Sequence, residues 1–303
     1  MSDRKLDLSG FSPIQRAELN RLTHRQGTSW PTVGVWVVVL GVYMASDALA
    51  VMRIIPLWVG GLVNCMIGYY AFTVVHDGIH FAICRNKRVN DWITQSAVVL
   101  AAPYLSLPAF RWGHLKHHRY TNDPRDDPDY VLHGLWWSLP LRWAFIDLLY
   151  FVHIMRHGDA VAFRHLRGSM PWVLGTVVAI VGLTVAGYGM EVLMLWFIPS
   201  RLIFIGLGFS FFWLPHVPHD TRQEDNFTQA TTVRVGWEWL MAPLLQWQHV
   251  HLIHHLYPTT PFFNNEKVWR LLEPALRRCD LAIQHGFAIQ PEIRPAPAAR
   301  KAA

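Results

Sequence analysis

The chain has 303 residues, of which 52% are hydrophobic and only 16% are charged, whereas soluble domains average about 25% charged residues. Because the apolar residues gather in long uncharged runs, this composition argues against a soluble protein. The net charge of +6 comes from scattered Lys and Arg residues without a nucleic-acid-binding motif, so we expect no nucleic acid partner and interpret the charge as a membrane-orientation signal.

Four apolar segments predict helices that cross a membrane: residues 32–52, 54–75, 169–190 and 192–215. Each is long enough, at about 1.5 Å per residue, to cross roughly 30 Å of hydrocarbon. The first and the last contain one charged residue each, Asp47 and Arg201, and the other two contain none. Because only short connections around Arg53 and Glu191 separate them, the segments pair into two hairpins. The sequence therefore predicts an all-α integral membrane protein with about four transmembrane helices.

Lys and Arg residues predict the orientation of these helices. Residues 1–31 carry five, residues 76–168 carry eleven and the chain after residue 215 carries nine, whereas the two hairpin connections carry one and none. Both termini and the central stretch are therefore expected in the cytoplasm. We expect a multi-pass protein of the bacterial inner membrane, with one domain over residues 1–303, a cytoplasmic segment at 1–31 and a Pro- and Ala-rich disordered tail at 286–303.

Eleven of the 17 histidines fall in four short clusters at the predicted cytoplasmic ends of the helices. The clusters are His76 and His80; His114, His117 and His118; His216 and His219; and His249, His251, His254 and His255. Helix positions three or four apart share a face, with Cβ atoms about 5–6 Å apart, so each pair can direct two imidazoles at one place. An adjacent third histidine can then reach a second metal. The clusters predict a cytoplasmic, histidine-rich helical cap that binds metal.

Two further apolar stretches are predicted not to cross the membrane. Residues 92–110 are uncharged but contain Pro103 and Pro108. If all clusters form one centre, His80 and His114 lie on one side of the membrane, so this stretch must dip in and return or lie along the interface. Residues 135–155 are also apolar, but Arg142, Asp147 and His153 favour an amphipathic helix on the membrane surface.

The number of histidines favours two first-row metal ions. A zinc site takes about four ligands, and the protease motif H-E-x-x-H is missing from the sequence. Haem is a weaker alternative, because paired axial histidines are expected inside the spans. Iron is favoured because imidazole suits it and two irons can bind and split O2. A membrane metal carrier or sensor remains a distant alternative. It would need polar or ionisable residues along the spans to pass the ion, and the two uncharged spans contain no Asp, Glu, Lys, Arg or His.

From Val74 to Arg270 the three histidine boxes resemble the membrane-bound fatty acid desaturase and hydroxylase superfamily, with one H-x(3,4)-H and two H-x-x-H-H motifs. The stretches HDGIHFAICRN, HLKHHRYTNDPRDDPD and HVHLIHHLYPTTPF more closely resemble its β-carotene ring hydroxylase branch. The resemblance implies two iron ions, O2 as co-substrate, a hydrophobic lipid substrate in the bilayer, and a separate electron donor, ferredoxin or a cytochrome with its reductase.

The resemblance also implies a ligand set and no catalytic residue beyond it: His76, His80, His114, His117, His118, His251, His254 and His255, completed by His216. Phe212 stands where the family has a polar residue, one turn before His216. Candidates that orient the ligands by hydrogen bonds, or alternatively cap helices, lie close to the boxes: Asp77, Asn122, Asp123, Asp127, His219 and His249.

The expected reaction is oxidation of an unactivated C–H bond of a long apolar lipid, and the branch resemblance favours β-ring carotenoid hydroxylation. The alternative is fatty-acyl chemistry: desaturation, hydroxylation or decarboxylation to a terminal alkene. The outcome depends on placement of the substrate on a sub-ångström scale, which the sequence leaves open.

Overall fold

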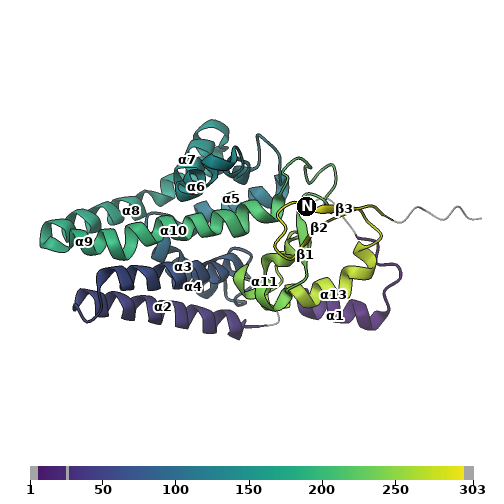
Figure 1. Ribbon diagram of the computed structural model, residues 1–303, viewed down its shortest axis with the longest axis horizontal. Coiled ribbons are helices and arrows are strands. Elements are labelled where there is room, and N and C mark those ends of the chain that lie inside the picture. The colour runs from purple at the N-terminus through teal and green to yellow at the C-terminus, as the bar shows by residue number, and fades with distance from the viewer. Residues whose placement is uncertain (1–5, 25–26, 297–303) are drawn as a thin grey trace, which may run out of the picture.

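Long helices form a bundle that carries a smaller cap at one end (Figure 1). The structure, a computed structural model, describes residues 6–24 and 27–296. Its helices are α1 (Pro13–Thr23), α2 (Trp30–Val51), α3 (Leu57–Ile79), α4 (Lys87–Ala101), α5 (Leu107–Tyr120), α6 (Leu139–Ala144), α7 (Ile146–His157), α8 (Ala160–Leu183), α9 (Gly189–Glu191), α10 (Ile198–Leu207), α11 (Glu238–Leu244), α12 (His251–Leu256) and α13 (Asn265–Leu276). Its strands are β1 (Thr232–Val235), β2 (Leu281–His285) and β3 (Glu292–Arg294).

The first hairpin consists of α2 and α3, which pack side by side along the bundle (Figure 1). Gly60 permits the close approach, because a Cβ atom there would lie 2.9 Å from the Cβ of Ala50. Asp47 accepts a hydrogen bond from Asn64 Nδ2 at 2.7 Å. The single charge of this span is therefore satisfied inside the hairpin, as a charge in hydrocarbon must be.

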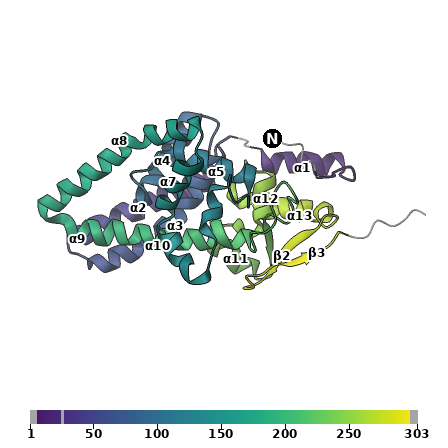
Figure 2. The same cartoon turned by 90° about the horizontal axis from the view of Figure 1, so that it is seen from above.

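The second hairpin is one helical stretch, Ala160–His216, that contains α8, α9 and α10. It reverses at Gly187, whose φ of 95° is a left-handed conformation that favours glycine. Figure 2 shows α8 and α10 as the two arms. Among the described residues, three helices are long and apolar enough to cross a membrane, or four if the bent pair α6 and α7 forms one span. Since the Ala160–His216 stretch supplies two arms, the predicted all-α membrane fold of about four spanning segments in two hairpins is confirmed.

Residues 92–110 dip into the bundle and return. Helix α4 packs on α3 and ends at Ala101, and α5 starts at Leu107 and runs back. Arg111 in α5 donates to the carbonyl of Ile79 at the end of α3. This return brings His80 and His114 to the same end of the bundle. Residues 135–155, predicted as one amphipathic helix, instead form two helices, because α6 and α7 meet at 88° around Phe145.

The return depends on close packing of α4 against Gly78. A Cβ atom at Gly78 would overlap Thr94 Oγ1 and lie 2.8 Å from Thr94 Cβ. We expect Gly78→Ala to destabilise the protein by about 1–3 kcal/mol, the usual cost of overpacking, and to lower its melting temperature in detergent. Gly175→Ala is the control, because a Cβ atom there meets nothing within 4 Å; equal melting temperatures of the two variants would contradict the packing argument.

The cap packs α1 and α13 against a small sheet that the sequence did not predict. Strand β1 pairs in parallel with β2, Thr232 opposite Ala282, and β2 pairs antiparallel with β3. Val233, Leu272 and Ile283 are at most 1% exposed in the cap core. The disordered tail expected from residue 286 is therefore corrected for residues 286–296, which include β3; residues 297–303, like 1–5 and 25–26, lie outside the described residues.

Candidate metal centre

The predicted metal ligands converge where the bundle meets the cap. His76 and His80 come from the end of α3, and the second box lies on α5. His216 ends the turn that follows α10, and the third box forms α12. On each helix the spacing of three or four residues puts the paired rings on one face. The local pattern therefore fixes the direction of the side chains, and the fold brings the four segments together.

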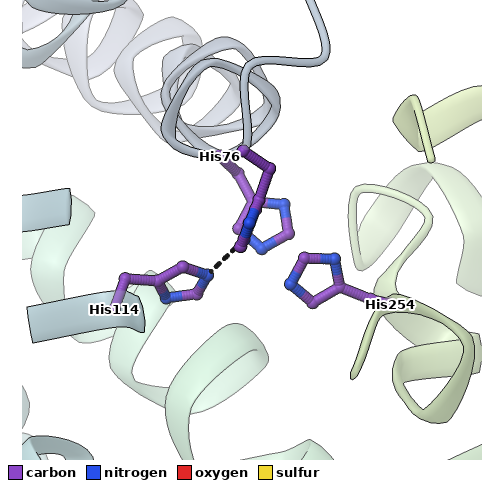
Figure 3. A group of neighbouring side chains, drawn as sticks. His76, His114 and His254 are labelled. Atoms are coloured by element: carbon purple, nitrogen blue, oxygen red, sulfur yellow. Dashed lines mark hydrogen bonds between the residues drawn. The ribbon is translucent and has the colours of Figure 1, made fainter. Parts of the chain in front are cut away.

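The first histidine group comprises His76, His80, His114 and His254, whose ligand atoms all lie within 4.8 Å of one another. Figure 3 shows His76, His114 and His254 pointing toward a common centre from separate elements. His118 lies beside this group, with its Nε2 atom 3.1 Å from His114 Nε2 and 2.8 Å from His254 Nε2.

The second histidine group comprises His117, His216, His251 and His255, again with ligand atoms within 4.8 Å. The Nε2 atoms of His251 and His255 are 3.2 Å apart. The ring of His216 is 4.7 Å from that of His117. All nine histidines that the sequence singled out as ligands thus lie in or beside two adjacent groups.

The protonation of these histidines suits metal binding. Burial, with the neighbouring imidazoles, holds the pKa well below its usual range at five of them outside the spanning helices: His114, His118, His251, His254 and His255. A neutral imidazole offers one nitrogen lone pair. Among the described residues, the buried Nε2 atoms of His76 and His216 have no hydrogen-bond partner, a costly state that a bound cation relieves. The residues therefore fit two metal ions.

Two carboxylates orient His117 from outside the second histidine group. Its Nδ1 atom lies 2.9 Å from Asp127 Oδ1 and 3.3 Å from Asp129 Oδ2. Burial lowers the pKa of His117, but Asp129 and Asp127 outweigh it and raise this pKa to about 9. Tyr150 donates its hydroxyl to Asp129. A carboxylate that accepts from the Nδ1–H of His117 fixes the tautomer of the ring. The Nε2 atom is then free to bind a metal, and the carboxylate increases the basicity of this nitrogen.

The other predicted neighbours of the ligands have different contacts. Asn122 supports Asp127, because its backbone N–H donates to Asp127 Oδ2 at 2.8 Å. Asp77 accepts from Thr32 Oγ1 at 2.7 Å and from the Phe262 N–H at 3.1 Å, and so ties α3 to α2 and the cap. Asp123 accepts from backbone N–H groups of its own loop.

The two remaining candidates are histidines outside both groups. His219 stacks on His133 with ring centroids 5.2 Å apart. His249 is buried, and neither of its ring nitrogens has a hydrogen-bond partner within the described part of the chain.

Several polar contacts to the ligands were not predicted from the sequence. Gln248 Oε1 lies 2.9 Å from His251 Nδ1, and its spacing of three residues from His251 could have revealed it. Gln223 Oε1 lies 3.3 Å from His255 Nδ1 and carries no local signal. At Phe212, the backbone carbonyl accepts from His216 Nδ1 at 3.0 Å, so His216 is oriented although a polar side chain is lacking there.

An apolar cavity of about 230 Å³ lies next to the first histidine group, between α3, α4, α5, α7, α8 and α10. Phe72 lines it and also contacts His76, with ring centroids 5.9 Å apart. Tyr104 and Asp147 line it too. Arg201 Nη1 donates to Asp147 Oδ2 at 3.0 Å, so the charge of the last span pairs inside the protein. The lining therefore suits an apolar group beside the histidines.

The sequence is similar to known proteins over most of its length. A family model described as "Fatty acid desaturase" matches residues 53–287. Zeaxanthin 4-ketolase of Chlamydomonas reinhardtii is 38% identical over 60 residues, 20% of this chain and 13% of the ketolase. The sn-1 oleoyl-lipid 12-desaturase of Arthrospira platensis is 33% identical over 96 residues, 31% of this chain and 26% of the desaturase. These matches cover only a small part of either relative.

Proposed function

Because the chain belongs to the fatty acid desaturase family, we propose that it is a membrane-bound, non-haem di-iron oxidoreductase. It would use O2 and two electrons to oxidise an unactivated C–H bond of a long apolar lipid. One observation carries this proposal: two adjacent groups of largely buried histidines lie beside an apolar cavity within the bundle. Iron suits a site of imidazole ligands, and zinc would require fewer of them.

Each histidine group would hold one iron. His76, His80, His114 and His254, with His118 beside them, would bind the first, and His117, His216, His251 and His255 the second. The bound irons would supply the activation of O2. The chain's own residues hold the ligands in place, through Asp127 on His117 and Gln248 on His251. Phe72 and its apolar neighbours in the cavity exclude water and position the substrate.

Two substrate classes have support. Hydroxylation of a β-ring carotenoid is the leading candidate, supported by the box sequences and by the similarity to a ketolase that is named for zeaxanthin. Fatty-acyl chemistry, meaning desaturation, hydroxylation or decarboxylation to a terminal alkene, is the second candidate. The similarity to an oleoyl-lipid desaturase supports it as strongly as the ketolase similarity supports the first, so only the box sequences favour the carotenoid.

We propose that the protein lies in a bacterial inner membrane, and the distribution of Lys and Arg supports a cytoplasmic position of the cap. The metal centre would then face the cytoplasm. A separate donor, ferredoxin or a cytochrome with its reductase, would deliver the electrons after docking on the basic cytoplasmic face.

The substrate is tested by mass spectrometry of lipid and headspace extracts from aerobic bacteria that accumulate β-carotene. Cells express the wild type or His255→Ala. We expect an oxygenated carotenoid only with the wild type. An unchanged carotenoid pool with new unsaturated, hydroxylated or terminal-alkene products would assign the protein to fatty-acyl chemistry. No new product of either kind would contradict the oxidoreductase proposal.

Filling the cavity is expected to separate turnover from metal binding. Ala101 lines the cavity, so Ala101→Phe should occupy the substrate's volume, reduce product formation and leave the iron content unchanged. Product and iron are measured on the same membranes. Ala48→Phe is the control, because Ala48 is exposed on α2. Full turnover by Ala101→Phe would show that the substrate binds elsewhere.

A further inference from the structure

The cap exposes an apolar patch outside the spanning segments, which we call the α11–hairpin patch. It combines residues at α11 with residues from the turn between β2 and β3. Its members, with their exposed fractions, are Trp237 (56%), Trp239 (76%), Leu244 (49%), Phe287 (65%) and Ile289 (43%). Trp237 and Phe287 bring the two segments together, with ring centroids 5.7 Å apart. Exposed apolar side chains that gather on two neighbouring segments in this way indicate an interaction site.

Hydrogen bonds to α3 place the patch beside the spanning helices. Tyr69 donates its hydroxyl to the carbonyl of Leu244 at 2.8 Å, and Gln246 Nε2 donates to the carbonyl of Tyr69 at 2.9 Å. Tyr69 lies ten residues before the end of α3, or about 15 Å along its axis. A hydrocarbon layer about 30 Å thick that starts at Leu57 includes this level. The patch therefore continues the lipid-facing surface of the bundle, and both views show α11 at the junction with the cap (Figures 1 and 2).

The backbone of the patch is satisfied by protein groups, as contact with lipid requires. Arg234, itself only 4% exposed, donates to the carbonyls of Gly286 and Ala288 in the hairpin turn. The Gly236 N–H donates to the Glu238 carboxylate. The carbonyls of Gly286 and Ala288 are thus bonded to the protein, while Phe287 between them presents its side chain outward.

We propose that the α11–hairpin patch inserts into one leaflet of a lipid bilayer, with Leu244 among the acyl chains and the tryptophans toward the headgroups, and anchors the cap there. Tryptophan is enriched where acyl chains meet headgroups, because its ring is apolar and its N–H meets polar groups. The anchor leads directly to the metal centre: Gln246, just after α11, bonds Thr73 Oγ1 at 2.6 Å, and Gln248 then contacts His251. Lipid contact would hold the third histidine box against α3.

Photo-crosslinking tests the anchor in isolated membranes. A benzophenone amino acid replaces Trp239 or Phe287 in the full chain, and adducts are identified by mass spectrometry after irradiation. We expect phospholipid adducts at both positions. The control is the same amino acid at Lys267, which is exposed on α13 in the cap, where we expect no lipid adduct.

Several results would overturn the anchor. Protein adducts at 239 and 287 would make the patch a docking surface for another protein, and a lipid yield equal to that at 267 would remove the membrane contact. Using both patch positions guards against local misfolding at one of them. The readout is a lipid adduct and does not depend on turnover, so the test is independent of the proposed chemistry.

Discussion

His118→Ala and His255→Ala are each expected to abolish turnover and to lower the iron content of the purified protein. His118 connects the two histidine groups, because its Nε2 atom lies within 3.1 Å of His114 and its ring stacks on His255 at 4.2 Å. His255 lies in the second group, with its Nε2 atom 3.2 Å from His251 Nε2. Removal of a ligand should cost more than the roughly 10–100-fold loss that follows removal of a hydrogen bond to a ligand.

Iron per chain, measured by elemental mass spectrometry, and product formation are the two readouts. His285→Ala is the matched control, because His285 is 47% exposed and pairs with Glu292 away from both histidine groups. All variants should insert into the membrane, since the apolar spans are unchanged. If both group variants kept wild-type iron and activity, the ligand assignment would be wrong.

The spanning helices and the histidine boxes were predictable because their signals are local. An uncharged run of sufficient length suffices to identify a span such as Leu57–Ile79. The spacing of His114, His117 and His118 on one helix is likewise visible in the sequence. Convergence of the boxes followed from placing them at one end of the spans.

The small sheet and the ordered tail were not predictable in this way. Strand β1 pairs with β2 about 50 residues later in the chain, Thr232 with Ala282, and β3 has only three residues. Such short strands have no clear alternation, and their pairing depends on tertiary contacts. The bend between α6 and α7 also lacks a marker, since the residue at the break is Phe145 and not proline or glycine.

The hydrogen-bonding neighbours of the ligands were only partly predictable. Asp123 and Asp127 lie in the same proline-containing loop and look equivalent in the sequence. Asn122, with a φ of 63°, turns the chain so that Asp127 reaches His117 while Asp123 caps the loop. The left-handed conformation of Asn122 depends on tertiary contacts, so the spacing of residues in the sequence does not reveal which aspartate reaches His117.

Because Asp127 and not Asp123 contacts His117, we expect Asp127→Asn to weaken metal retention about 10–100-fold. This is the usual cost of losing the hydrogen-bond partner of a ligating histidine. Asn is nearly isosteric with Asp, but it is neutral and cannot accept hydrogen bonds with both side-chain atoms. Asp127 accepts from both His117 Nδ1 at 2.9 Å and the Asn122 N–H at 2.8 Å. One of these contacts must therefore be lost, and the stabilisation of the His117 Nδ1–H by a charge is lost with it.

Asp123→Asn is the matched control, because it makes the same chemical change four residues away without touching a histidine. Metal retention is measured as iron remaining per chain during dialysis against increasing chelator, at a pH where both proteins are folded. We expect Asp127→Asn to release iron at a lower chelator concentration than the wild type and Asp123→Asn to match the wild type. Equal release by the two variants would mean that the carboxylate on His117 supports the loop and not the metal. A shift confined to Asp127→Asn would show that an ordered loop outside the histidine boxes contributes to holding the second metal.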